Sequence, residues 1–351
     1  MPATARAARL STRFFFPVFL CWKFWLALFR YLILHSMQNN SSCFLAYLRA
    51  LVNTVRPRVI ITGADNNATL ASLVEITPDV WFIFVQTAMR DTAQGFPHGI
   101  RLPTYYAFGQ SEQLIFDTLR VRCRQYVPTG SIKLGYALSD PAPPAFASAD
   151  LCFISNHRPE RPVSAVPPLE QTIAATDDLL FMHSCEYARR NDLILRIVAK
   201  SREPNWQEKE RLHYQKLYED YPLDFVTADK STRELDTYHA LLASGLVIHN
   251  ASTLGFEALA AEKKVLFGAS MNPQLVRNWG ISAYFDQVPD FMCLQQKDFS
   301  HFEQKLDALR AMSLDEYWRR TSATARQVIS QDINFPPHEH IREAIRKYLL
   351  N

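Results

Sequence analysis

The stretch that most constrains this chain runs from Leu246 to Phe267, where two short apolar runs enclose a polar loop and a helical pattern. The apolar runs at Leu246–Ile248 and Val265–Phe267 predict two buried strands, and the residues between them predict a helix from about Thr253 to Glu262. A strand–helix–strand unit of this kind requires parallel strands in one sheet. The chain is therefore predicted to be an α/β protein.

The polar loop after the first of these strands is a candidate ligand site, because open α/β sheets bind ligands at the carboxyl ends of their strands. Ser252 and Thr253 stand where the helix begins, so their hydroxyls can cap it, and its free N–H groups can hold a phosphate. Glu257 lies one turn further on the same face, where it can accept hydrogen bonds from a diol. This spacing suits a sugar nucleotide. The alternative is an ordinary helix cap, with Glu257 paired to Lys263 or Lys264.

The length of 351 residues predicts two domains, because single cores stop growing at roughly 250–300 residues. Strand and helix patterns alternate through residues 37–140 and again through residues 151–335. Among them, we expect a helix from Ser111 to about Arg122 followed by an extended segment at Tyr126 and Val127, and a helix from Ser231 to Ala243. Residues 141–150 have the composition of a linker, and residues 336–351 are predicted to form a C-terminal helix. We expect two Rossmann-like domains that face each other across a cleft.

The net charge, the spacing of the cysteines and the absence of several known motifs argue against several classes of protein. A formal net charge of +3 is too small to argue for a nucleic-acid partner. The six cysteines are scattered without a C-x-x-C pair, which suits a reducing compartment and argues against a zinc site or a disulfide scaffold. The sequence contains no G-x-x-x-x-G-K-[ST], no G-x-G-x-x-G and no G-x-S-x-G, which weakens kinase, dehydrogenase and esterase interpretations.

Residues 1–36 form a basic and aromatic segment. Arg6, Arg9 and Arg13 precede the run from Phe14 to Leu34, which a lysine and an arginine interrupt. A signal peptide fits weakly because no small-residue cleavage site follows, and the longest uncharged run is about half of the ~20 residues that a transmembrane helix needs. The segment is predicted either to lie in a membrane interface as a peripheral helix or to pack as a core helix of the first domain.

Polar residues at other strand ends would meet in the predicted cleft. Asp65 is a candidate general base for an acceptor hydroxyl, although an Asp-Asn-Asn sequence also suits a simple turn. Lys200 and Arg202 can neutralise a nucleotide phosphate or can form a solvated strand end. Arg90, in the loop after Gln86, can bind an anionic acceptor or can simply be exposed.

With these residues in view, the chain resembles bacterial surface-carbohydrate biosynthesis proteins, a group of glycosyltransferases with the GT-B architecture of two Rossmann-like domains. The stretches that carry the resemblance are Pro57–Asn67, Ile83–Gln86, Thr129–Ser131, Ser252–Ala260 and Lys263–Val265. The resemblance implies transfer of a sugar from a nucleotide-sugar donor, held mainly by the C-terminal domain, to a lipopolysaccharide or capsule acceptor. We expect a metal-independent enzyme without a cofactor, because the N–H groups at a helix start and basic side chains can carry the charge of the leaving phosphate.

On this resemblance Asp65 is the acceptor-side catalytic carboxylate. The expected donor-binding residues are Ser252, Thr253, Gly255, Glu257, Lys200 and Arg202. The expected acceptor-side residues are Asn66, Gln86, Arg90 and Ser131. The chain departs from the family pattern where Gln86-Thr-Ala88 replaces Gln-Asn-Gly and where Glu262 replaces the glycine before the paired lysines.

Two alternatives remain open. The first is a transferase of polyol phosphate from a CDP-activated donor on a similar scaffold, which would be expected to use histidines in both domains. The second is a catalytically silent GT-B-like protein that holds a membrane assembly through Phe14–Leu34. The main expectation is a cytoplasmic enzyme, peripheral to the inner membrane, whose partners are a nucleotide sugar and a glycan or lipid-linked acceptor.

Overall fold

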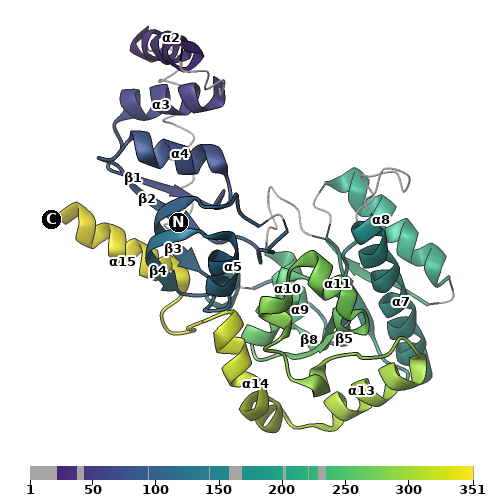
Figure 1. The fold of residues 1–351 in the computed structure, drawn as a ribbon. Helices are drawn as coiled ribbons and strands as arrows, with labels where there is room; N and C mark the ends of the chain where they lie inside the picture. Colours follow the sequence, from purple (N-terminus) through teal and green to yellow (C-terminus); the bar gives the residue numbers. More distant parts are fainter. Residues whose placement is uncertain are drawn as a thin grey trace.

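The computed structural model describes residues 22–37, 43–93, 95–141, 143–157, 168–200, 203–219, 221–227 and 235–350. Within these ranges the chain forms two parallel sheets, each with its own helices, that lie side by side (Figure 1). The two sheets belong to two successive parts of the chain, and the C-terminal end returns to the first part.

The N-terminal sheet holds strands in the order β1-β2-β3-β4, all parallel. The strands are β1 (Val59–Thr62), β2 (Trp81–Val85), β3 (Arg101–Ala107) and β4 (Arg122–Pro128). Helices α4 (Ala68–Ile76) and α5 (Glu112–Leu119) connect strands, and α6 (Ile132–Leu138) follows β4. Buried aromatic side chains such as Phe82, Phe84 and Tyr105 fill the space between the sheet and its helices. Because the strands are parallel, their carboxyl ends meet at one edge.

The C-terminal sheet has the order β7-β6-β5-β8-β9, again all parallel. Its strands are β5 (Ala149–Ile154), β6 (Leu195–Val198), β7 (Asp224–Val226), β8 (Ser244–His249) and β9 (Lys264–Phe267). The chain builds outward from β5 in one direction and then crosses to the other side at β8. The boundary between β5 and β8 is therefore a topological switch point, where sheets of this kind bind ligands.

Helices cover both faces of the C-terminal sheet (Figure 1). They are α7 (Pro168–Arg190), α8 (Pro204–Leu217), α9 (Asp236–Leu242), α10 (Thr253–Ala260), α11 (Pro273–Trp279), α12 (Ser282–Phe285) and α13 (Phe299–Ala311), with the short 3-10 turns η2 (Ala269–Met271) and η3 (Asp290–Met292). The strand–helix–strand unit predicted at Leu246–Phe267 is present as β8, α10 and β9.

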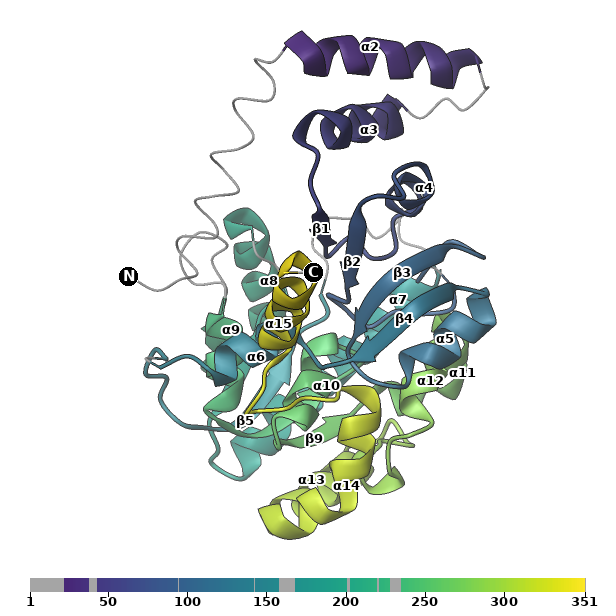
Figure 2. The same cartoon turned by 90° about the vertical axis from the view of Figure 1, so that its left-hand side faces the viewer.

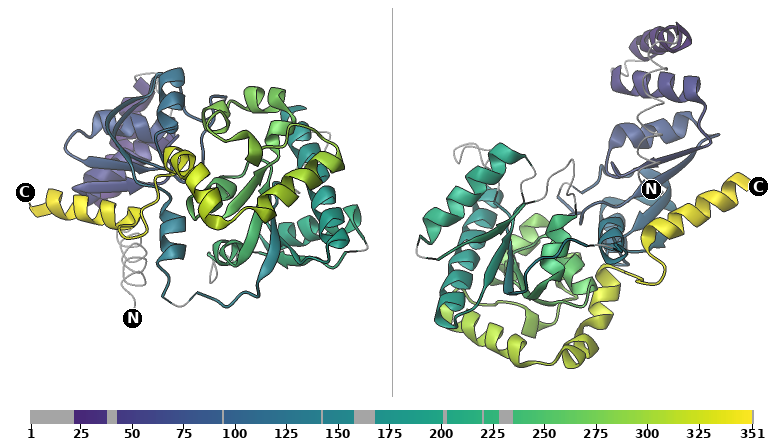
Figure 3. Two further views of the ribbon diagram at one scale, coloured as in Figure 1. Left: turned by 90° about the horizontal axis from the view of Figure 1, so that it is seen from below. Right: turned by 180° about the vertical axis from the view of Figure 1, so that it is seen from behind.

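The C-terminal end of the chain ties the two parts together. After α14 (Leu314–Val328), the backbone N–H of Ser330 donates to the carbonyl of Phe108 at 2.7 Å. At Gly109 a Cβ would come within 2.5 Å of two carbonyl oxygens of the same crossing segment, so only glycine fits there. Helix α15 (Pro337–Leu350) then lies beside the N-terminal sheet (Figures 2 and 3).

Two further helices, α2 (Trp22–Met37) and α3 (Cys43–Val55), extend the N-terminal part away from the C-terminal sheet (Figure 1). Helix α2 packs on α3, and α3 packs on α4. Among the described helices, none combines the length and the apolar character needed to cross a bilayer. The first part of the predicted segment Phe14–Leu34, up to residue 21, lies outside the described residues.

The structure corrects two sequence-based boundaries. Arg122–Pro128 is a full strand, although the sequence predicts a helix to about Arg122 and an extended segment only at Tyr126 and Val127. The helix before it ends at Leu119 because Arg120 takes a left-handed backbone conformation with φ 55°. The helix predicted from Ser231 begins at Asp236, and Ser231 itself lies outside the described residues.

Candidate functional site

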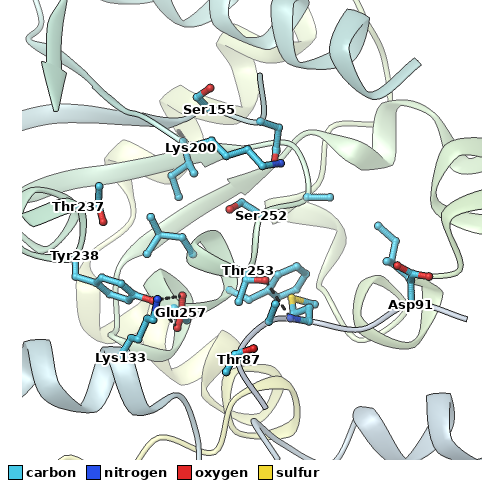
Figure 4. Close-up of a pocket in the computed structure, with 18 of the residues that line it drawn as sticks. Thr87, Asp91, Lys133, Ser155, Lys200, Thr237, Tyr238, Ser252, Thr253 and Glu257 are labelled. Atoms are coloured by element: carbon cyan, nitrogen blue, oxygen red, sulfur yellow. Dashed lines mark hydrogen bonds between the residues drawn. The ribbon is translucent and has the colours of Figure 1, made fainter. Parts of the chain in front are cut away.

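A cavity of about 400 Å³ lies where the carboxyl edges of the two sheets face each other (Figure 4). This volume is in the range of small-ligand sites. The C-terminal part contributes the polar side chains Ser155, Asn156, Lys200, Thr237, Tyr238, Ser252, Thr253 and Glu257. The N-terminal part contributes Thr87, Asp91 and Lys133. Asp91 lies on the opposite side of the cavity from Thr237 and Tyr238 (Figure 4).

The cavity sits at the topological switch point of the C-terminal sheet. Ser155 and Asn156 follow β5, and Ser252 and Thr253 follow β8, the neighbouring strand on one side. Lys200 follows β6, the neighbour on the other side. Three adjacent strand ends therefore deliver hydroxyl, amide and ammonium groups to one wall, as a phosphate-bearing ligand requires.

The start of α10 faces this wall without the cap that the sequence predicts. Ser252 is the N-cap residue, but its side chain makes no capping hydrogen bond. The Thr253 hydroxyl accepts a hydrogen bond from the backbone N–H of Met89 in the N-terminal part, at 3.0 Å. The positive end of the helix dipole is thus directed at the cavity, where it favours an anion.

Asn156 adds a hydrogen-bond donor to the same wall. The residue is 7% exposed, and its side-chain nitrogen has no hydrogen-bond partner among the described residues. Buried polar groups are normally paired, so an unpaired donor in a cavity wall indicates a ligand or water partner. The Lys200 ammonium approaches the side-chain oxygen of Asn156 at 3.4 Å.

A buried hydrogen-bond network supports this wall from behind. Asp177 accepts from the backbone N–H of Asn156 at 3.0 Å and from the Tyr214 hydroxyl at 2.7 Å. The Tyr214 hydroxyl is also 2.7 Å from the Ser155 hydroxyl. Burial raises the pKa of Asp177 to about 7, against the opposing effect of its hydrogen bonds. The network fixes the loop after β5 on the long helix α7.

Glu257 lines the cavity, and it also joins the two parts of the molecule. Its carboxylate accepts from the Tyr238 hydroxyl at 3.0 Å and from the hydroxyl of Ser131, which caps α6. Lys263 and Lys264 instead donate to backbone carbonyls, so they do not pair with Glu257 as the alternative interpretation required. Ser131, expected on the acceptor side, lies at this contact between the domains.

Gly255, another expected donor-binding residue, does not line the cavity. Gly255 lies on α10 against His249, and a Cβ there would meet the imidazole ring at 2.3 Å. Its role is close packing of the helix on the strand end. Arg202 lies outside the described residues.

Asp65 and Arg90 do not face the cavity, contrary to the sequence-based expectation. Asp65 is 0% exposed and forms an ion pair with Arg90, whose Nε donates at 3.1 Å. The Tyr105 hydroxyl donates to the same carboxylate at 2.8 Å. The two loops that carry these charges fold onto each other, so each charge neutralises the other. A carboxylate held in this way is a structural group and is not placed to take a proton from an acceptor.

Gln86 and Asn66, also expected on the acceptor side, lie outside the cavity lining. Gln86 is buried, donates to Glu112 at 2.7 Å and accepts from the backbone N–H of Phe108 at 2.6 Å. Asn66 is half-buried in the turn before α4 and does not line the cavity. Glu112 accepts a further hydrogen bond from Tyr284 of the C-terminal part. Burial raises the pKa of Glu112 to about 8, although both hydrogen bonds lower it.

The loop after β2 supplies cavity-lining residues that sequence reasoning missed. Besides the bond from Met89 to Thr253, the backbone N–H of Arg90 donates to the Tyr284 hydroxyl and that of Thr92 donates to the Gly280 carbonyl, both at 3.1 Å. These bonds hold Asp91 at the cavity. The sequence contains a partial indication of these residues, because they follow the predicted strand that ends near Gln86, and strand ends of this kind bind ligands.

Possible metal ligands and histidines were located within the described ranges. Within them, no three His, Cys, Asp or Glu side chains form a group that could hold a metal ion. No histidine is among the described residues that line the cavity. His249, just before the loop at the start of α10, is fully buried, and burial lowers its pKa to about 3.

Comparisons with known proteins agree with this architecture. A protein-family model described as "putative O-antigen biosynthesis protein" matches residues 124–340. A search of curated proteins gives no significant match.

Solved structures similar to the chain include a "putative UDP-N-acetylglucosamine 2-epimerase" from Listeria monocytogenes, with a TM-score of 0.52, 12% identity, and coverage of 87% of this chain and 78% of the other. A UDP-GlcNAc 2-epimerase from Methanocaldococcus jannaschii has a TM-score of 0.52, 10% identity and coverage of 88% and 81%. A variant of the wall teichoic acid polymerase TagF has a TM-score of 0.51, 10% identity and coverage of 89% and 77%. These likenesses concern the fold, and they confirm the predicted GT-B architecture of two Rossmann-like domains.

The ion pair of Asp65 predicts a stability effect. Replacing Asp65 with Ala leaves the Arg90 guanidinium, 15% exposed, and the buried Tyr105 hydroxyl without their acceptor. We expect the free energy of unfolding in urea to fall by about 3–5 kcal/mol. Asp79 is exposed, so Asp79→Ala is the matched control and should keep the parental free energy of unfolding. Parental stability in Asp65→Ala would show that the carboxylate does not hold the loops together.

The buried carboxyl group of Glu112 predicts a pH effect. Its pKa rises from 4.5 to about 8 on folding, so its contribution to stability is fully present below pH 4.5 and is lost as the pH rises to about 8. Between about pH 5 and about pH 9, the melting temperature of the parent should fall relative to that of Glu112→Gln, which carries no titrating proton. The exposed variant Glu343→Gln should follow the parent. A constant difference between parent and Glu112→Gln would contradict the assignment.

Proposed function

Because the chain belongs to the O-antigen biosynthesis family, we propose that it is a glycosyltransferase that moves a sugar from a nucleotide-sugar donor to a surface polysaccharide or lipopolysaccharide acceptor. The observation that carries the proposal is the cavity at the switch point, to which the C-terminal domain brings a helix start, an amide donor and a lysine, and the N-terminal domain brings the carboxylate of Asp91. The M. jannaschii structure of the same fold holds UDP-GlcNAc and UDP, which supports a nucleotide-sugar donor.

The donor phosphates fit the wall of the C-terminal domain. In this proposal they accept hydrogen bonds from the N–H groups at the start of α10, from the Ser252 hydroxyl and from the Asn156 amide, while Lys200 supplies a positive charge. These groups stabilise the negative charge that grows on the leaving phosphate. The chemistry proposed here requires no metal ion.

Asp91 replaces Asp65 as our candidate general base. It is half-buried, and it is the carboxylate that the N-terminal domain brings to the cavity within the described residues. In the proposed step Asp91 takes the proton of an acceptor hydroxyl, and that oxygen forms a bond to the anomeric carbon of the sugar. The bond from the anomeric carbon to the phosphate oxygen breaks, and the nucleotide leaves with the electron pair.

The acceptor approaches from the side of the N-terminal domain in this proposal. The loop after β2 and the start of α6 form that side, with Thr87 and Lys133 available to hold acceptor groups. We propose a glycan or a lipid-linked glycan as the acceptor, used at the cytoplasmic face of the inner membrane. The alternative of a polyol-phosphate transferase expects histidines in the cavity, and the described wall contains none.

The proposal predicts that Asp91→Asn lowers turnover and leaves donor binding unchanged. The parent is incubated with a panel of UDP-, GDP-, dTDP-, CMP- and CDP-linked donors and an acceptor glycan extract, and the released nucleotide is measured. Loss of the base should reduce turnover by about 10²–10⁴-fold, while calorimetry shows parental donor affinity.

Lys200→Ala should weaken donor binding, and it should also lower turnover because Lys200 stabilises the charge on the leaving phosphate in this proposal. Asp286 is exposed, so Asp286→Asn is the control for the loss of an aspartate elsewhere in the chain and should behave like the parent. Parental turnover in Asp91→Asn would remove the proposed base. Absence of heat with every donor would favour the catalytically silent scaffold.

A further inference from the structure

The outer face of α2 carries a stripe of exposed apolar side chains. Trp22, Trp25, Leu26, Phe29 and Ile33 are between 45% and 67% exposed. Their spacing of three or four residues places them on one side of the helix. Soluble surfaces seldom expose such a contiguous set, so this stripe indicates a partner.

The opposite face of α2 is occupied. Phe24 is 0% exposed, and its ring lies 5.8 Å from that of Tyr47 on α3. The guanidinium of Arg49 on α3 lies 4.4 Å from the centre of the Tyr31 ring. The helix is therefore fixed on α3 through its inner face, and the apolar stripe points outward. The inner face of α2 packs as the core-helix interpretation predicts. The exposed outer face is the one that a peripheral membrane helix would use.

The charge around the stripe is entirely positive. Lys23 and Arg30 are exposed along one border of the stripe. Residues 1–64 contain eight Lys or Arg and no Asp or Glu, so the remaining 287 residues carry a formal charge of −5 within the total of +3. This separation of charge along the chain favours an anionic partner at the N-terminal end.

We infer that α2 and α3 form a docking surface for an anionic lipid bilayer. Tryptophan and phenylalanine enter the interfacial region, while Lys23 and Arg30 contact lipid phosphates. A second copy of the chain is a weaker fit, because two surfaces of this positive charge would repel each other. The surface lies at the end of the N-terminal domain that is remote from the C-terminal sheet (Figures 1 and 2).

The inference deepens the proposed function, on which it rests for one point only, the nature of the acceptor. If the N-terminal domain presents the acceptor and also binds the bilayer, the acceptor class is a glycan on a lipid anchored in that bilayer. Docking itself does not depend on sugar transfer, because it involves none of the residues that line the cavity.

The test is sedimentation of the full chain with lipid vesicles in the absence of any donor. We expect the parent to bind vesicles of phosphatidylcholine with phosphatidylglycerol, and to bind pure phosphatidylcholine weakly. The variant Trp25→Glu/Phe29→Glu should lower binding to the anionic vesicles by roughly tenfold or more. The variant Lys23→Glu/Arg30→Glu should lose the preference for anionic lipid and the sensitivity to salt.

The matched control places the same charges on exposed apolar residues elsewhere. Ile194→Glu/Leu314→Glu, at positions 54% and 61% exposed, should bind vesicles like the parent. Circular dichroism and light scattering of every variant report folding and oligomeric state. Failure of the parent to bind anionic vesicles would overturn the inference, as would parental binding by Trp25→Glu/Phe29→Glu. A parent dimer that this variant converts to a monomer would identify a second copy as the occupant and would equally overturn it.

Discussion

The contact between the two domains positions the cavity, and it includes the hydrogen bond from the backbone N–H of Met89 to the hydroxyl of Thr253. Parallel strands put their loops at one edge of each sheet, and this bond joins the loop after β2 to the helix start after β8. This bond, together with those from Arg90 to Tyr284 and from Thr92 to Gly280, holds Asp91 in the lining of the cavity. A shift of the loop after β2 would therefore change the distance between the proposed base, Asp91, and the proposed phosphate site at the start of α10.

The buried charged groups near the cavity hold loops in place, whereas the side chains that line the cavity carry the proposed chemistry. Asp65 with Arg90, and Glu112 with Gln86 and Tyr284, fix the acceptor-side loops from inside the domain contact. Isolated buried charges are costly, so each carboxyl group has hydrogen-bond donors or keeps its proton. In the C-terminal domain, Asp177 holds the loop after β5 by accepting a hydrogen bond from the backbone N–H of Asn156.

Sequence patterns predicted the sheets and the cavity-lining residues of the C-terminal domain better than those of the N-terminal domain. The strand-end rule identifies Ser252, Thr253 and Lys200, and applied to β5 it would also identify Ser155 and Asn156. The pairing of Asp65 with Arg90 joins residues 25 positions apart and depends on how two loops fold, which local patterns do not contain. Strand β4 was missed in large part because its exposed polar residues lack apolar alternation.

Hydrogen exchange with mass spectrometry tests the central claim most directly, because it reports both walls of the cavity at once. The chain is compared with and without each UDP-, GDP-, dTDP- and CDP-linked donor. If the donor binds between the two sheets, one donor should slow amide hydrogen exchange in residues 251–257, after β8, and in residues 87–93, after β2. Exchange in α15 should be unchanged. Protection confined to another surface, or none with any donor, would contradict a donor site between the two sheets.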